Sequence, residues 1–331
     1  MIPINKNIIT SVSMILYLLL IVGCQSEGET LDIPASDHNL LLVSHLKEPL
    51  LTVIDLEEST VIKELDIPFI VSDMTKVNES EIILSSQQSE YLFSLNITNH
   101  KLKPLYEVGK GINELLYIEE TEMIYATNAM EDELLKINLD SDSSVKRVST
   151  DEHPASMTYD YNKNELYVAN VYDHSIQSFT GDTLELIESF TILERPNGLL
   201  YFDEHLIAGG HGSTGELNRN SFIFSLKDQE TIQQIETGLM PIDFIKNKDK
   251  LYSISHGSHE VFEIDPDTLE VTKMLDIGYN PYYSFVYDDY LLISALDGHT
   301  ITFIDMNLFE ITQEIDVAPG PHAIVLLEGI K

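Results

Sequence analysis

Seven short apolar segments recur along the chain at nearly fixed spacing. They are LLVSH (41–45), IILSS (82–86), IYATN (124–128), LYVAN (166–170), LIAGG (206–210), LYSIS (251–255) and LLISA (291–295). Each is rich in leucine, β-branched or aromatic residues and is bounded by turn formers, which is typical of a buried strand. Because a repeat of this kind dictates a whole architecture, it constrains the fold more than any other feature of the sequence.

A second strand follows in every unit and ends at a polar or small residue. These end residues are Asp55, Asn96, Asn138, Thr180, Ser225, Asp265 and Asp305. They lie 14 residues after the start of the first strand in six units and 19 after it in the fifth. A further landmark, usually a proline, follows 16 residues later in every unit: Val71, Ile112, Pro154, Pro196, Pro241, Pro281 and Pro321. Two spacings held this well indicate one structural unit repeated seven times.

Each unit is about 40 residues long and holds four strands, which suits a propeller blade. We label the strands a to d outward from the axis, with strand a following the landmark. The first strand a comes after Val71, whereas the last one, from Pro321, lies at the C-terminal end. The sequence therefore predicts an all-β, seven-bladed β-propeller with four-stranded blades over residues 38–331. The C-terminal strand completes the first blade, which closes the ring and protects its edges.

The N-terminal segment predicts a lipoprotein. An apolar run over residues 15–22 leads into Ile21-Val22-Gly23-Cys24, which holds the single cysteine and resembles the bacterial lipobox. A membrane-spanning helix is the alternative, but the run is shorter than the roughly 20 residues that a span needs. We expect residues 1–23 to be a signal peptide and Cys24 to be lipidated. Residues 24–37 would then tether an extracytoplasmic propeller to a bacterial membrane.

The repeat also resembles a known family. LYVAN followed by HSIQSF, and the segment FEIDPDTLEVTKMLDIGYNP, are similar to the YVTN-type propeller repeat. The likeness extends over all seven units and implies the propeller fold. It leaves the activity open, because proteins of this kind include binding modules, surface proteins and lactonase-like enzymes.

Composition narrows the choice of partners. Acidic residues outnumber basic ones 55 to 19, so the formal net charge is −36 and the surface repels a phosphate backbone. We therefore exclude nucleic acid as a partner and expect a monomer that meets the membrane through its lipid. The sequence contains no CxxCH haem motif, no GxSxG elbow and no phosphate-binding P-loop.

The predicted channel mouth collects polar residues. Strand direction alternates, so the b–c loops and d–a connections share one face, which we call the top face. The first residues of the strands a surround the mouth there and supply the candidates Asp73, Asn113, Glu114, Asn197, Asp243, Tyr282, Tyr283 and His322. Such a ring could hold a small polar ligand or a divalent cation, calcium or a transition metal. The alternative is a wet polar channel without a specific ligand.

Histidines also gather in the top-face loops. The candidates there are His45, His174, His211, His256, His259 and His299, with Arg219 as a rare positive charge. Neutral imidazole is a common transition-metal ligand, but scattered surface histidines are the alternative, since HExxH spacing is absent. The stretch GGHGSTGELNRN (209–220) contains the whole excess length of the fifth unit, which predicts an extended b–c loop.

Two functions are compatible with these features. The first is a non-catalytic envelope lipoprotein that binds a protein or a small polar ligand at the top face and channel mouth. The alternative is a lactonase-like, metal-assisted hydrolase or lyase. In that case Asp73, Glu114, Asp243 and His322 would hold a cation that activates water.

Overall fold

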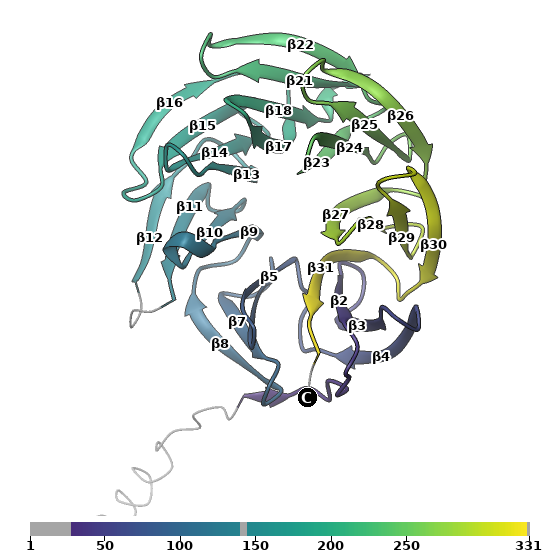
Figure 1. Ribbon diagram of the computed structural model, residues 1–331. Coiled ribbons are helices and arrows are strands. Elements are labelled where there is room, and N and C mark those ends of the chain that lie inside the picture. Colours follow the sequence, from purple (N-terminus) through teal and green to yellow (C-terminus); the bar gives the residue numbers. More distant parts are fainter. Residues whose placement is uncertain (1–27, 140–143, 330–331) are drawn as a thin grey trace, which may run out of the picture.

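The structure, a computed structural model, describes residues 28–139 and 144–329. The predicted signal peptide, the lipobox and Cys24 lie outside this range. Seven antiparallel sheets surround a central axis, which confirms the seven-bladed propeller (Figure 1). Within the described ranges the single helix is a 3-10 turn, η1 (Glu119–Thr121), and no helix has the length and apolar character to cross a membrane.

Each blade has four strands, which follow the chain from the axis outward except in blade 1, where the C-terminal strand is innermost. Blade 1 consists of β31 (Pro321–Leu327), β2 (Leu40–His45), β3 (Leu50–Asp55) and β4 (Thr60–Asp66), and blade 2 of β5 (Asp73–Asn78), β6 (Glu81–Ser85), β7 (Tyr91–Asn96) and β8 (Lys101–Glu107). Blade 3 consists of β9 (Ile112–Ile118), β10 (Met123–Asn128), β11 (Glu133–Asn138) and β12 (Ser144–Ser149), and blade 4 of β13 (Pro154–Asp160), β14 (Glu165–Asn170), β15 (Ser175–Thr180) and β16 (Leu186–Phe190). Blade 5 consists of β17 (Pro196–Phe202), β18 (His205–Gly210), β21 (Asn220–Ser225) and β22 (Glu230–Glu236). Blade 6 consists of β23 (Pro241–Asn247), β24 (Lys250–Ser255), β25 (Glu260–Asp265) and β26 (Glu270–Asp276), and blade 7 of β27 (Pro281–Tyr287), β28 (Tyr290–Ala295), β29 (Thr300–Asp305) and β30 (Glu310–Asp316).

The ring closes as the spacing predicts. The C-terminal strand β31 pairs antiparallel with β2, and the pairs include Leu40 with Leu327 and Leu42 with Val325. Figure 1 shows this strand, in yellow, beside the purple β2 near the start of the described chain. The inner edge of blade 1 is therefore paired, and the first and last blades of the sequence become neighbours.

Burial explains the sequence pattern of the strands. All six residues of β2 are buried, because the second strand of each blade lies between two neighbouring blades and packs on both of its faces. The outer strand β4 alternates between exposed and more buried residues, because one of its faces meets solvent. Seven apolar clusters result, one at each blade junction.

The polar residue at the end of the third strand has a structural cause. The Asp55 Oδ1 atom accepts hydrogen bonds from the backbone N–H groups of Glu57 and Glu58, at 3.0 and 2.9 Å. Asn96, Asp265 and Asp305 do the same for the residues two and three positions later. A short polar side chain therefore fixes the c–d turn, which accounts for this landmark of the repeat.

The described part of the segment that we expected to act as a tether packs against the propeller. Strand β1 (Glu29–Thr30) adds to the outer edge of β8, and Leu31 and Ile33 are buried in the core between blades 1 and 2. The Lys63 Nζ atom of β4 lies 2.8 Å from an Asp32 carboxylate oxygen. We call residues 28–34 the N-terminal strap, because they join the outer strands of blades 1 and 2.

The extended b–c loop of blade 5 is a small hairpin. Strands β19 (Gly212–Ser213) and β20 (Glu216–Leu217) pair antiparallel and project from the top face between β18 and β21. Gly215, at the tip, has a positive φ of 99° with open space around its missing Cβ, so the tip is a glycine turn. The excess length of the fifth unit is thus a separate element beyond the blade itself.

The strap should contribute to stability. We expect Ile33→Ala to lower the free energy of unfolding by roughly 2–5 kcal/mol, because the side chain is 2% exposed and its removal leaves a cavity between two blades. Ile187→Ala is the matched control, since Ile187 is 46% exposed and its loss should change the free energy by less than about 0.5 kcal/mol. Urea unfolding followed by circular dichroism measures both. Equal effects of the two substitutions would show that the strap is not part of the folded core.

Candidate functional site

The first residues of the innermost strands are aimed into the channel by a repeated irregularity. The ladder between the first two strands shifts register directly after Pro154, Pro196, Pro241 and Pro281, and a similar shift occurs beside Pro321. A β-bulge places an extra residue on one strand and redirects its neighbours. The proline landmark therefore marks the points where side chains turn from the blade toward the axis.

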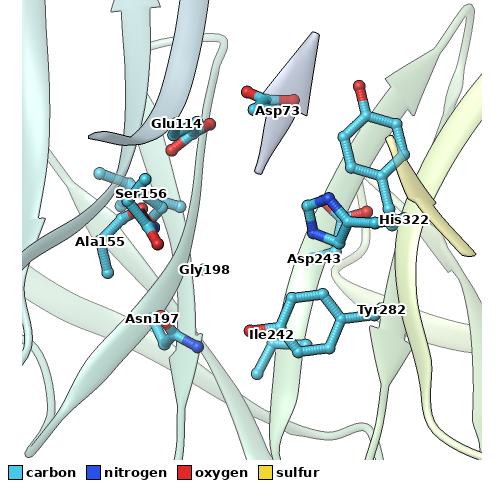
Figure 2. A pocket seen from close by; sticks show the side chains of 13 residues that line it. Asp73, Glu114, Ala155, Ser156, Asn197, Gly198, Ile242, Asp243, Tyr282 and His322 are labelled. Carbon is cyan, nitrogen blue, oxygen red and sulfur yellow. Dashed lines mark hydrogen bonds between the residues drawn. The ribbon is translucent and has the colours of Figure 1, made fainter. Parts of the chain in front are cut away.

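These side chains meet in one cavity of about 120 Å³. All eight channel-mouth candidates line it, together with Ser156, which occupies the aligned position in blade 4, and with residues that the sequence analysis did not select: Ala155, Gly198, Leu199 and Ile242. Figure 2 shows Glu114, Ser156 and Asn197 on one side of the opening and His322, Tyr282 and Asp243 on the other. The lining contains three carboxyl groups and no lysine or arginine, so the cavity is suited to a cation or a hydrogen-bond donor.

Each carboxyl group of the cavity also joins two blades. Asp73 accepts a hydrogen bond from the Leu115 N–H at 2.7 Å, and Glu114 accepts one from the Met157 N–H at 2.8 Å. Asp243 accepts bonds from both the backbone N–H and the hydroxyl of Ser284, at 2.7 and 2.6 Å. In each case the donor lies on the inner strand of the next blade. The carboxylates therefore hold neighbouring inner strands together.

Burial changes the acidity of these groups. It raises the pKa of Asp73 to about 7 and that of Asp243 to about 6, against hydrogen bonds that favour the ionised form. Burial also raises the pKa of Glu114 well above its usual range, and the neighbouring Asp73 adds to this. Asp73 and Asp243 thus change charge close to neutral pH within one cavity.

His322 and two tyrosines form the opposite wall. The His322 ring centre lies 5.3 Å from that of Tyr282 and 5.4 Å from that of Tyr283. The imidazole hydrogen-bonds to the Ser72 backbone, and burial lowers its pKa to about 4. Its Nδ1 atom is buried and has no hydrogen-bond partner among the described residues. At neutral pH the wall is therefore uncharged and offers one free lone pair.

No three His, Cys, Asp or Glu side chains in the described ranges are arranged to hold a metal ion. Asp73, Glu114, Asp243 and His322 share the cavity but do not converge on one point. The metal-assisted alternative would therefore require these side chains to move while they are bonded to the neighbouring blade.

Four of the six histidines predicted in the top-face loops have structural roles. In His174, His259 and His299 the Nδ1 atom accepts the backbone N–H of the residue 21 positions later, at distances of 3.0–3.2 Å. Asp132 accepts the corresponding bond from the His153 N–H in blade 3. His45 is fully buried, and its two ring nitrogens contact the Thr52 hydroxyl and the Pro319 carbonyl. These side chains fix the d–a connections, and they do not line the cavity.

His211 and His256 differ from those four. Their ring centres lie 5.3 Å apart at an interplanar angle of 85°, and His256 in turn contacts Tyr282 of the cavity at 6.1 Å. One nitrogen of each ring, His211 Nδ1 and His256 Nε2, is buried without a hydrogen-bond partner in the described structure. Arg219 lies at the base of the hairpin, is about half exposed and faces Glu236 at 3.7 Å. The two histidines therefore lie beside the cavity, next to Tyr282, whereas Arg219 faces Glu236.

No family model and no curated protein matches the chain. Solved structures with a similar fold include three with very different descriptions. They are the dihydro-heme d1 dehydrogenase NirN in complex with DHE (10% identity, 91% of this chain and 77% of that chain, TM-score 0.65), apo AztD from Citrobacter koseri (12%, 89% and 98%, 0.60) and a functionally unknown protein from Desulfotomaculum acetoxidans DSM 771 (9%, 87% and 98%, 0.71). At such low identities the likeness establishes the β-propeller fold and no activity.

The raised pKa of Asp243 predicts a pH-dependent contribution to stability. A carboxyl group whose folded pKa of about 6 exceeds its ordinary value of 3.8 stabilises the fold below the lower value and loses this effect as pH rises through the higher one. Between pH 4.5 and 7.5 the loss amounts to about 2 kcal/mol. Asp243→Asn should remove this pH dependence. The unfolding free energy of the wild type minus that of the variant should therefore fall by about 2 kcal/mol between pH 4.5 and pH 7.5.

The comparison with the variant is needed because buried histidines oppose the effect. The pKa values of His45, His211 and His322 fall to about 4 on burial, so these groups stabilise the fold above their ordinary pKa and less at acidic pH. Urea unfolding of both proteins across the range isolates the Asp243 contribution. A difference that does not change with pH would show that Asp243 is ionised throughout.

Proposed function

We propose that this protein is a lipid-anchored, extracytoplasmic binding protein, without catalytic activity, that holds a small organic ammonium ion in the channel-mouth cavity. The observation that carries the proposal is the lining itself. Asp73 and Asp243 supply negative charge when they ionise close to neutral pH, Tyr282 supplies an aromatic face, and the lining contains no lysine or arginine that would compete with the ligand. Ammonium groups bind to aromatic faces through cation–π attraction and to carboxylates through charge.

The carboxylates support this proposal because a neutral group can make the same bond between blades. In blade 4 the Thr158 hydroxyl accepts the Tyr201 N–H at 2.9 Å and so joins two inner strands in the same way as Asp73 and Asp243 do. A neutral hydroxyl therefore suffices for the structural bond. Buried carboxyl groups with raised pKa values cost free energy when they ionise, and such groups are typical of binding sites.

The size and coordination of the cavity favour an organic cation over a calcium ion. Calcium takes six to eight oxygen ligands, whereas the carboxylate oxygens here already accept backbone N–H groups and do not converge. A volume of about 120 Å³ is below the roughly 300–1,000 Å³ of pockets for drug-sized ligands. A ligand with few heavy atoms is therefore the best match.

The strap supports a particular attachment to the membrane. Gly28 packs against the outer strand β8, and four residue steps of at most about 3.6 Å separate it from Cys24. A lipid on Cys24 would hold the propeller by the outer rim of blade 2. The cavity opens along the axis at the top face, so this attachment leaves the cavity accessible.

The ligand proposal is tested with two probes and their uncharged analogues. We expect choline or putrescine to raise the melting temperature of the purified protein, because a ligand of the folded state stabilises it by about 2.7 kcal/mol at a hundredfold excess over Kd. 3,3-Dimethylbutan-1-ol and butane-1,4-diol have nearly the same shapes without charge and should have no effect. The shift should be larger at pH 8 than at pH 5.5, since the cation needs ionised Asp73 and Asp243.

Asp243→Asn should abolish most of the thermal shift. Asp289→Asn should preserve it, because this substitution changes a carboxylate that pairs with Lys248 on the face opposite the top face. Isothermal titration calorimetry provides the stoichiometry, with one ammonium ion expected per chain. Equal effects of charged and uncharged probes, or a full response in Asp243→Asn, would refute the proposed ligand class.

The anchor is tested separately. We expect Cys24→Ser to move the protein from the membrane fraction, or the detergent phase of a Triton X-114 partition, into the aqueous phase, because the thiol that carries the lipid is gone. Metabolic labelling with a radioactive fatty acid should mark the wild type and not the variant. Label retained in Cys24→Ser would show that the lipid, if any, is attached elsewhere.

A further inference from the structure

We propose that His211 and His256 form a transition-metal site at the lip of the cavity, with Zn²⁺ as the ion that it would bind. The two imidazoles come from neighbouring blades 5 and 6 and contact each other edge to face. The site is distinct from the carboxylate cavity and does not depend on the identity of the ligand there. Its location follows from the two ring nitrogens that the fold leaves without partners among the described residues.

The tautomer of His256 is determined by its neighbours. The Asn280 Nδ2 atom donates to an Asp297 carboxylate oxygen at 2.9 Å, so the Asn280 Oδ1 atom faces His256 Nδ1, also at 2.9 Å. An amide oxygen only accepts, and His256 Nδ1 therefore carries the proton. Its Nε2 atom keeps a lone pair, and this atom is buried without a partner in the described part of the chain.

This arrangement is typical of a metal-binding histidine. Ligating imidazoles commonly donate their second N–H to a carboxylate or carbonyl oxygen, which fixes the ring and raises its basicity. Here the chain Asp297–Asn280–His256 provides that support, and Lys47 and Asn280 hold the pKa of Asp297 below its usual range. The second ring, His211, contributes a buried Nδ1 atom that also lacks a partner in the described structure.

The separation of the two rings matches that of two imidazoles on one ion, and the rings must rotate out of edge-to-face contact for both nitrogens to point at it. Two imidazoles on a tetrahedral ion, with metal–nitrogen distances of about 2.0–2.1 Å, have ring centres roughly 5 Å apart. The observed separation is 5.3 Å. Burial lowers the pKa values of both rings, so both are neutral and able to bind a metal at pH 7.

The fold would supply only part of the coordination of this ion. Two protein ligands leave two positions of a tetrahedral ion for water or for a molecule that reaches up from the cavity past Tyr282. Groups of three or more ligands are absent from the described residues, so we expect moderate affinity and a replaceable ligand. Both histidine side chains are only partly buried, whereas the two nitrogens are buried, so the same ring rotation would expose them to an ion from the top face.

The test measures the binding of Zn²⁺ and Co²⁺ to the purified protein. We expect one ion per chain by equilibrium dialysis, and visible absorption of the Co²⁺ form with the intensity of a tetrahedral complex. His211→Ala and His256→Ala should each weaken binding at least about tenfold. Asn280→Gly should weaken it by about 10- to 100-fold, because it removes the support of His256 while glycine tolerates the positive φ of 56° at that position.

His299→Asn is the matched control. It removes a top-face imidazole that accepts the Gly320 N–H, and asparagine tolerates the positive φ of 58° there, so metal affinity should not change. Circular dichroism verifies that each variant is folded before binding is measured. The proposal is overturned if the wild type binds neither ion, if both histidine variants bind as the wild type does, or if Asp243→Asn rather than the histidine variants abolishes binding.

Discussion

The pairing of β31 with β2 is the constraint on which the rest of the structure depends. Each apolar cluster lies between two blades, so no blade buries its faces unless both neighbours are in place. Closing a loop of nearly the whole chain length is not prohibitive, because each doubling of loop length adds only about 0.6 kcal/mol. A seven-residue strand that is paired along its length and packed against two blades offsets that cost. The N-terminal strap adds buried side chains to the cluster beside this closure.

Closure also explains why the functional side chains meet. The strands a of a closed ring converge at the axis, where each blade contributes one to three residues to the cavity, and in blades 4 to 7 bulges after the proline landmarks turn these residues toward the axis. The cavity therefore takes side chains from blades 1 to 7, whose sequence positions extend from Asp73 to His322. The same carboxylates that accept N–H groups from the next blade face this cavity. Structural bonding and binding chemistry thus use the same atoms, and a ligand that changes their charge acts on the junctions between blades.

The fold was predicted almost completely from the sequence, because the spacing of the repeated strands follows directly from the order in which the chain builds each blade. Strand count, blade count and the C-terminal closure all followed from two distances, and the eight channel-mouth candidates share one cavity because their aligned positions do. Hydrogen-bond partners were not predictable in the same way. Nothing in the letters around His259 and His256 shows that the first accepts the Asn280 N–H while the second retains a nitrogen without a partner among the described residues. The strap was missed because residues 28–34 lie outside the repeat and have no aligned counterpart.

The histidines show how a repeat acquires a unique site. In blades 4, 6 and 7 the imidazole at the last position of the b–c turn has a positive φ and fixes the d–a connection. Blade 5 replaces this turn with the hairpin β19–β20, so His211 lies at its base without that task. Blade 6 has a second histidine, His256, in addition to the structural His259. An arc of rings, His211, His256, Tyr282 and His322, then passes through blades 5, 6, 7 and 1 into the cavity. This arc begins at blade 5, the unit whose spacing departs from the repeat. The irregular blade is therefore the one beside which a specific site could form.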